Sequence, residues 1–158
     1  MTDVAEPGQF LVERRIVIDA PADAVYAQLI DFHNWTAWSP WEDVDPEMDR
    51  TYTGAESGVG ARYAWKGNRK AGQGNMSIAQ VRTDREVDID LHFDKPFKAN
   101  NKIAFRLDPE GGSTWVKWSM TGPKTLMSRV MGVVMSMDKL VGKDFEKGLA
   151  QLKDVVEG

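Results

Sequence analysis

The residues best suited to chemistry gather in one short segment, residues 38–43, which reads WSPWED. Trp38 and Trp41 are large amphipathic side chains of the kind that forms the rim of a binding pocket. Glu42 or Asp43 could act as a general base if an apolar wall raised its pKa. The competing interpretation, a solvated acidic loop, is the commoner situation for adjacent carboxylates. The segment therefore favours a pocket mouth more strongly than it favours catalysis.

Histidine and cysteine usage narrows the possible chemistry. The chain has no cysteine, which excludes disulfides, thiolate chemistry and cysteine-based metal sites. Its two histidines, His33 and His92, are too far apart in the sequence to predict a histidine-rich metal centre. His92 falls on the polar register of a predicted strand and so on the outer surface, whereas His33 could cap a helix C-terminus or reach a cavity mouth. No set of nucleophile, base and orienting partner is visible, so we expect no metal or cofactor and name no catalytic residue.

A basic patch and two glycine pairs could indicate other kinds of binding site. Arg62, Lys66, Arg69 and Lys70 lie near Trp65, which would suit a nucleic-acid surface or an anionic head group. The chain is acidic overall, with a net charge of −4 and a pI of about 5.2, so a solvated turn and no nucleic-acid partner are favoured. The pairs at residues 58–60 and 72–74 precede no helix, so they predict β-bulges that bend a sheet instead of phosphate loops.

Length and composition limit the possible architecture of the whole chain. With 158 residues, 42% of them hydrophobic and 28% charged, the chain is typical of one ordinary globular domain with its own core. We predict a loose tail over residues 1–8 and a single domain over residues 9–158. The N-terminus has no apolar signal region, and no window approaches the roughly 18 apolar residues of a membrane span. We therefore expect a cytoplasmic protein with no stable membrane insertion.

Periodicity predicts the elements that would position the candidate side chains. Hydrophobic and polar residues alternate along several short segments between residues 50 and 121, which is the pattern of an antiparallel sheet buried on one face. A first strand and two short helices precede them. The predicted strands are Phe10–Asp19, Arg50–Thr53, Gly60–Trp65, Gly72–Thr83, Glu86–Phe93, Lys98–Leu107 and Thr114–Thr121, and the predicted short helices lie within residues 21–30 and 32–41.

The C-terminal third changes to a helical period. Apolar residues recur at steps of three to five from about Lys124 to Val156, which predicts one long helix that must lie across the sheet. The fold class is then α+β, with a curved antiparallel sheet of six to seven strands wrapped around this helix. Curvature leaves a space where sheet and helix diverge, and such spaces form mostly apolar pockets.

Inward-facing aromatic and methionine side chains would line that space. Methionine is flexible and polarizable, so a stripe of methionines one turn apart on the helix would adapt to irregular ligands. The alternative for any one of these residues is that it simply fills the core. The predicted ligand contacts are Trp38, Trp41, Tyr63, Trp65, Met76, Leu91, Phe93, Phe105, Trp118, Met120, Met127, Met131 and Met135.

Several motifs together resemble a known family. They are IxIDAPxxxVY at residues 16–26, DFxxWxxWSPW at 31–41, GVGA at 58–61, TGP at 121–123 and FxxGLxxLK at 145–153. The combination resembles the polyketide cyclase/dehydrase branch of the START-like superfamily, also called SRPBCC, over about residues 10 to 155. The N-terminal motifs carry most of the specificity.

The resemblance implies a helix-grip fold with a deep hydrophobic cavity. Members bind lipids, sterols, polyketides or other apolar molecules, and some catalyse cyclisation or dehydration, but the family has no universal catalytic motif. Three functions stay open: a binding protein for a small hydrophobic ligand, a cyclase- or dehydratase-like enzyme, and an interaction module like the related chaperone activators. A buried ionisable pair in the cavity would favour the enzyme, and a purely apolar cavity the binding protein. If the methionine stripe lines the cavity, Met131→Trp should abolish ligand uptake.

Overall fold

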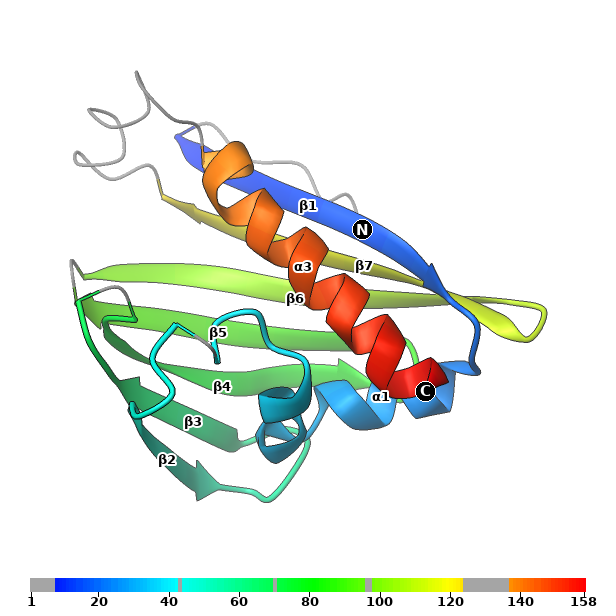
Figure 1. Ribbon diagram of the computed structural model, residues 1–158, viewed down its shortest axis with the longest axis horizontal. Coiled ribbons are helices and arrows are strands. Elements are labelled where there is room, and N and C mark those ends of the chain that lie inside the picture. The colour runs from blue at the N-terminus through cyan, green and yellow to red at the C-terminus, as the bar shows by residue number, and fades with distance from the viewer. Residues whose placement is uncertain (1–7, 43, 70, 96–97, 124–136) are drawn as a thin grey trace.

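The structure is a computed structural model that describes residues 8–42, 44–69, 71–95, 98–123 and 137–158. Its strands form one antiparallel sheet in the order β1-β7-β6-β5-β4-β3-β2, as Figure 1 shows. Strands β2 to β7 follow one another along the chain as a meander, and β1 pairs with β7 at the far edge. The strands are β1 (Gln9–Ile18), β2 (Asp49–Gly54), β3 (Ala61–Lys66), β4 (Gln73–Arg82), β5 (Glu86–Lys95), β6 (Ala99–Glu110) and β7 (Ser113–Pro123).

Three helices lie on the concave side of the sheet in the described part of the chain. Helix α1 (Ala22–Leu29) follows Pro21, whose fixed φ suits a helix start, and the 3₁₀ helix η1 (Phe32–Ala37) follows directly. Helix α3 (Met137–Glu157) runs along β1 and across the sheet, and its C-terminal end lies beside α1 (Figure 1). This arrangement confirms the predicted α+β fold class, and each predicted strand overlaps an observed one.

One of the remaining predictions is confirmed, and two others fall wholly or partly outside the described residues. The second short helix is the 3₁₀ helix η1, which ends at Ala37 and is followed by a turn, as predicted. The long helix was predicted to start near Lys124, and residues 124–136 lie outside the described residues. The division into a tail over residues 1–8 and one domain also stays a prediction, since residues 1–7 are not described.

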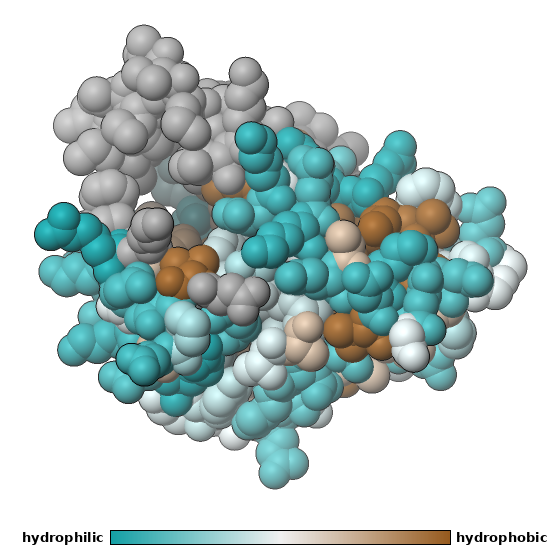
Figure 2. All heavy atoms as spheres, in the orientation of Figure 1, coloured by the Kyte–Doolittle hydropathy of each residue, from teal (hydrophilic) through white to brown (hydrophobic). Residues whose placement is uncertain are grey.

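An aromatic core joins the layers. The rings of Trp118 and Phe145 stack with centroids 4.0 Å apart, which fixes α3 on strand β7. Phe105 stacks on the same indole from strand β6, and Trp38 meets it edge-on. These side chains are fully buried, whereas hydrophilic residues cover most of the face seen in Figure 2. The apolar interior therefore lies between the concave side of the sheet and the helices.

Candidate functional site

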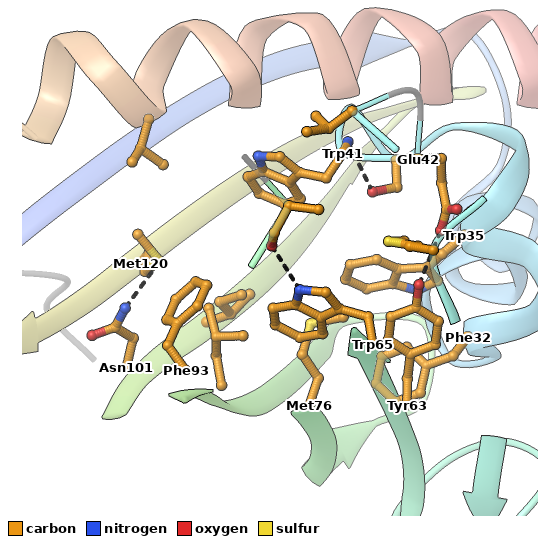
Figure 3. Close-up of a pocket in the computed structure, with 17 residues that line it drawn as sticks. Phe32, Trp35, Trp41, Glu42, Tyr63, Trp65, Met76, Phe93, Asn101 and Met120 are labelled. Atoms are coloured by element: carbon orange, nitrogen blue, oxygen red, sulfur yellow. Dashed lines mark hydrogen bonds between the residues drawn. The ribbon is translucent and has the colours of Figure 1, made fainter. Parts of the chain in front are cut away.

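One apolar pocket of about 220 Å³ lies beside this core (Figure 3). Its floor comes from the inner face of strands β3 to β7, where Met76 lies opposite Leu91 and Ile103 lies opposite Met120 in the strand register. Helix η1, the segment between it and β2, the β3–β4 turn and Val141 of helix α3 complete the wall. The pocket is thus a space that sheet and helix leave between them, in keeping with the curvature argument.

The tryptophans of the pocket present carbon surfaces to it. Each of their indole N–H groups already donates to the protein: Trp35 to the Leu29 carbonyl at 3.0 Å and Trp65 to the Ala71 carbonyl at 2.9 Å. Trp41 donates to a carboxylate oxygen of Asp144 on α3 at 3.3 Å. Because these donors are satisfied, the aromatic walls offer a ligand dispersion and stacking contacts rather than hydrogen bonds.

Gly74 makes room for the Trp65 wall. A Cβ atom at Gly74 would lie 2.7 Å from the Trp65 ring and 2.3 Å from the His92 carbonyl oxygen. The β4–β5 register shifts between Gln73 and Gly74, so a bulge accompanies this close approach. The prediction that the glycine pair at residues 72–74 permits a bulge is confirmed.

An ion pair with a neighbouring phenol forms one polar end of the pocket. Arg50 on β2 places its Nε and Nη2 atoms 2.7 and 2.6 Å from the same oxygen, Oε2 of Glu42. The Tyr63 hydroxyl on β3 donates to the other oxygen, Oε1, at 3.4 Å. The Glu42 and Arg50 side chains retain 12% and 22% of their exposure. Glu42 and Tyr63 line the pocket, whereas Arg50 is not among the lining residues.

The electrostatics of this end keep the phenol protonated. Burial raises the pKa of Tyr63, and the negative charge of Glu42 raises it further, while Arg50 acts in the opposite direction. A tyrosine whose pKa lies above its ordinary value is neutral at physiological pH. Tyr63 therefore carries its proton, which is directed at Glu42.

Asn101 is a second polar group in the pocket wall. Its side chain is 7% exposed, and its Nδ2 atom contacts the Met120 sulfur at 3.8 Å, a weak acceptor. In Figure 3 Asn101 and Met120 lie on one side of Trp65, and Glu42 and Tyr63 lie on the other. The pocket therefore has an apolar middle between two polar ends.

Seven of the predicted ligand contacts line this pocket. They come from four strands and from the turn after η1, which alternation and the WSPWED segment had singled out. That they contact a ligand remains a prediction. They are Trp41, Tyr63, Trp65, Met76, Leu91, Phe93 and Met120.

Three other predicted contacts lie in the core instead. Trp38, Phe105 and Trp118 face inward as alternation requires, but they are fully buried against one another and do not line the pocket. The physical reason is that α3 seats Phe145 directly on Trp118 at this point. They pack in the core, and that they contact a ligand stays a prediction. Met127, Met131 and Met135 lie outside the described residues.

Sequence reasoning missed several lining residues, some of which carried a usable signal. Asn101 continues the inward register of Ile103, so extending that alternation by one step would have found it. Glu42 was considered for acid–base chemistry but not as a ligand contact. The missed lining residues are Phe32, Trp35, Ser39, Glu42, Val44, Met48, Ala71, Asn101, Ile103 and Val141.

Both histidines lie away from this pocket. His33 stacks on Tyr52, with ring centroids 4.1 Å apart, and its Nδ1 lies 2.8 Å from Asp31 Oδ1, beside a separate hollow of about 120 Å³. It is the second residue of η1, so neither predicted role, a helix C-cap or the cavity mouth, is correct. His92 is on the outer face as predicted. Hydrogen bonds to Asn100 and Asp94 raise its pKa, because both ring nitrogens face acceptor oxygens.

Within the described residues, no cluster of three or more histidine, aspartate or glutamate side chains is arranged to hold a metal ion. No described helix is long and apolar enough to cross a membrane. Arg62, Lys66 and Arg69 of the basic patch are exposed on β3 and the turn that follows it, and Lys70 is not described.

A curved antiparallel sheet that wraps around a C-terminal helix is the helix-grip fold. Residues 9–157 match the family described as polyketide cyclase / dehydrase and lipid transport, so the chain belongs to that family. The resemblance seen in the motifs is therefore confirmed. No sequence among curated proteins matches this chain significantly.

Solved structures share the fold at low sequence identity. Protein CV1439 from Chromobacterium violaceum has a TM-score of 0.66 at 14% identity, with 97% of this chain and 99% of that chain covered. The Aha1 dimer from Colwellia psychrerythraea has a TM-score of 0.62 at 16% identity, covering 94% and 96% of the two chains. Ara h 8.0201 has a TM-score of 0.64 at 10% identity, covering 94% and 98%. At these identities the likeness establishes the fold alone.

Proposed function

We propose that this protein binds a small, mostly apolar molecule in the pocket between sheet and helix. The observation that carries the proposal is the composition of the wall: mainly aromatic, aliphatic and methionine side chains with satisfied indole donors, and few polar side chains. Such a wall gains free energy by removing an apolar surface from water. Membership of a family whose description includes lipid transport supports the same direction.

Uptake of a neutral fluorescent probe tests the proposal. N-phenyl-1-naphthylamine is apolar, uncharged at neutral pH and brighter in apolar surroundings. Titration into the wild-type protein should give saturable enhancement with one site. Val141 on α3 lines the pocket and is only partly buried, so Val141→Trp should fill the space and raise the Kd at least about tenfold.

A substitution on the same helix provides the matched control. Val155 is exposed and lies outside the pocket lining, so Val155→Trp adds the same bulk to α3 without entering the pocket. The control should bind the probe like the wild type, and circular dichroism should show that both variants fold. Probe uptake that Val141→Trp leaves unchanged would place binding elsewhere and contradict the proposal.

A catalytic role of the cyclase or dehydratase kind is a second candidate, and one observation favours it. Glu42, which lines the pocket, forms a partly buried ion pair with Arg50, and a purely apolar pocket would lack such an ionisable pair. The Glu42 Oε1 atom belongs to a lining side chain, so it could take a proton from a carbon next to a ligand carbonyl. Removal of that proton begins both aldol-type cyclisation and dehydration.

Isotope exchange separates the two candidates. In deuterated buffer, a pocket base would accelerate exchange of the methyl protons of 2-acetonaphthone, which proton NMR follows directly. Acceleration by the wild type that Glu42→Gln removes would establish base chemistry. Binding of the ketone without acceleration over buffer would leave a binding protein. The third alternative, an interaction module, has the fold likeness to the Aha1 dimer as its support.

A further inference from the structure

From the polar end formed by Glu42 and Tyr63 we infer which ligands the pocket selects: neutral apolar molecules that carry a hydroxyl or N–H donor, with their carboxylate analogues disfavoured. This inference rests on the proposed function, since it concerns the same pocket. It follows from which hydrogen-bonding groups of Glu42, Arg50 and Tyr63 are already used within the protein and which remain open to a ligand.

The two carboxylate oxygens of Glu42 are used unequally. Oε2 receives both Nε and Nη2 of Arg50, at 2.7 and 2.6 Å. Oε1 receives one contact, the Tyr63 hydroxyl at 3.4 Å, which is longer than an ordinary hydrogen bond between oxygens. An ionised carboxylate oxygen accepts about two hydrogen bonds, so Oε1 retains acceptor capacity inside an apolar wall. A donor on the ligand would satisfy it.

Arg50 does not offset this preference for donors. Its Nη1 atom donates to the Met48 carbonyl at 3.2 Å, so each guanidinium nitrogen already has a partner. Arg50 is also not among the residues that line the pocket. The guanidinium therefore pairs with Glu42 from the side away from the pocket and does not present a cation to the ligand.

Tyr63 adds an acceptor to the same end. Its raised pKa keeps the hydroxyl protonated, and that proton is directed at Glu42 Oε1, because an ionised carboxylate can only accept. The phenol oxygen is then left with lone pairs. Glu42 and Tyr63 together form an end that accepts hydrogen bonds, so a ligand hydroxyl fits it and a ketone or ether oxygen does not.

The negative charge of Glu42 also disfavours anionic ligands. The Glu42 side chain is 12% exposed, so water screens it weakly. A ligand carboxylate at this end would meet a like charge at short range and would lose its hydration shell on entry. A neutral hydroxyl pays neither cost and gains a charge-assisted hydrogen bond.

Three naphthalenes test the inference because they share one apolar skeleton. 2-Naphthol carries a donor and is neutral at pH 7, 2-methoxynaphthalene keeps the oxygen without the donor, and 2-naphthoate is an anion. Isothermal titration calorimetry should give 2-naphthol a Kd about tenfold below that of 2-methoxynaphthalene, and 2-naphthoate the weakest binding. Glu42→Gln should bring the first two Kd values close together and improve binding of 2-naphthoate.

Controls separate this inference from the function beneath it. Glu146 is a surface carboxylate on α3 that pairs with Arg14, so Glu146→Gln removes one negative charge without touching the pocket and should keep the wild-type ranking. If N-phenyl-1-naphthylamine binds but 2-naphthol shows no advantage, or if 2-naphthoate binds tightest, the inference is overturned while the pocket stands. If neither that probe nor any naphthalene binds the wild type, the proposed function itself is contradicted.

Discussion

Asn101 brings a primary amide into an otherwise apolar part of the pocket wall. Its Nδ2 atom reaches the Met120 sulfur at 3.8 Å, and the Oδ1 atom lies against the backbone of Gly122. A sulfur acceptor returns little of the free energy that an amide loses when it leaves water. At the scale of the single residue, we therefore expect Asn101 to lower the stability of the protein and to offer a hydrogen bond to a ligand.

The substitution Asn101→Leu tests this view. Leucine has nearly the shape of asparagine and no polar atoms, so we expect the free energy of unfolding to rise by about 1 kcal/mol. Urea unfolding followed by tryptophan fluorescence measures the change, with an unchanged m-value as the sign of an unaltered native state. A loss of stability on this substitution would mean that the amide has a structural role.

At the scale of the elements, the seating of α3 on the sheet depends on how closely its backbone approaches. A Cβ atom at Gly148 would lie 2.8 Å from both Pro40 Cδ and Trp118 Cζ3. Both neighbours are parts of rings in the packed interior, so neither can move aside cheaply. Glycine at this position lets the helix reach the aromatic core.

A pair of identical substitutions tests that contact. Gly148→Ala should lower the free energy of unfolding by about 2 kcal/mol, because overpacking outweighs the gain in helix propensity. For Gly142→Ala, on the same helix, the three atoms nearest to the added Cβ all belong to the guanidinium of Arg14, the far end of a long side chain. This substitution should be neutral or stabilising by up to about 1 kcal/mol. Equal effects of the two substitutions in chemical denaturation would show that backbone approach does not seat α3.

The elements were largely predictable because most of the sheet is buried on one face. On β5 and β6 the inward residues Ile89 and Ile103 lie directly opposite each other, and polar residues occupy the other face. Such alternation fixes both the strand and its facing direction. The 3₁₀ end of η1 at Ala37 was not predictable, because the hydrogen bonds from Trp38 N and Ser39 N to the Trp35 carbonyl depend on tertiary packing around these rings.

The pocket was less predictable than the sheet, because alternation shows which side chains face inward but not how deeply each one is buried. Trp118 and Met120 are two residues apart on β7 and both face inward, yet Met120 lines the pocket and Trp118 lies beneath Phe145. Only the position of the crossing helix distinguishes them. Likewise Glu42 and Arg50 are eight residues apart in irregular and strand segments, and no local pattern pairs them.

At the scale of the whole molecule, one apolar interior is divided into a packed part and a hollow part. The packed part lies under α3, where aromatic rings from β6, β7, α3 and the segment around η1 stack on one another. The hollow part lies over β3 to β7 beyond the helix contact. We expect stability to come mainly from the first and binding from the second, since close packing leaves no room for a ligand.

The same substitution in each part tests this division. Phe105 is fully buried and stacks on Trp118 with centroids 5.0 Å apart, so Phe105→Leu should lower the free energy of unfolding by about 2 kcal/mol. Phe93 is partly buried, lines the pocket and meets Trp65 edge-on at 5.7 Å. Phe93→Leu should therefore cost less than about 1 kcal/mol but shift the Kd for N-phenyl-1-naphthylamine, whereas Phe105→Leu should leave that Kd nearly unchanged. Chemical denaturation and probe titration give the free energy of unfolding and the Kd of each variant. If both variants lost stability and affinity in parallel, the core and the pocket would not be separable parts.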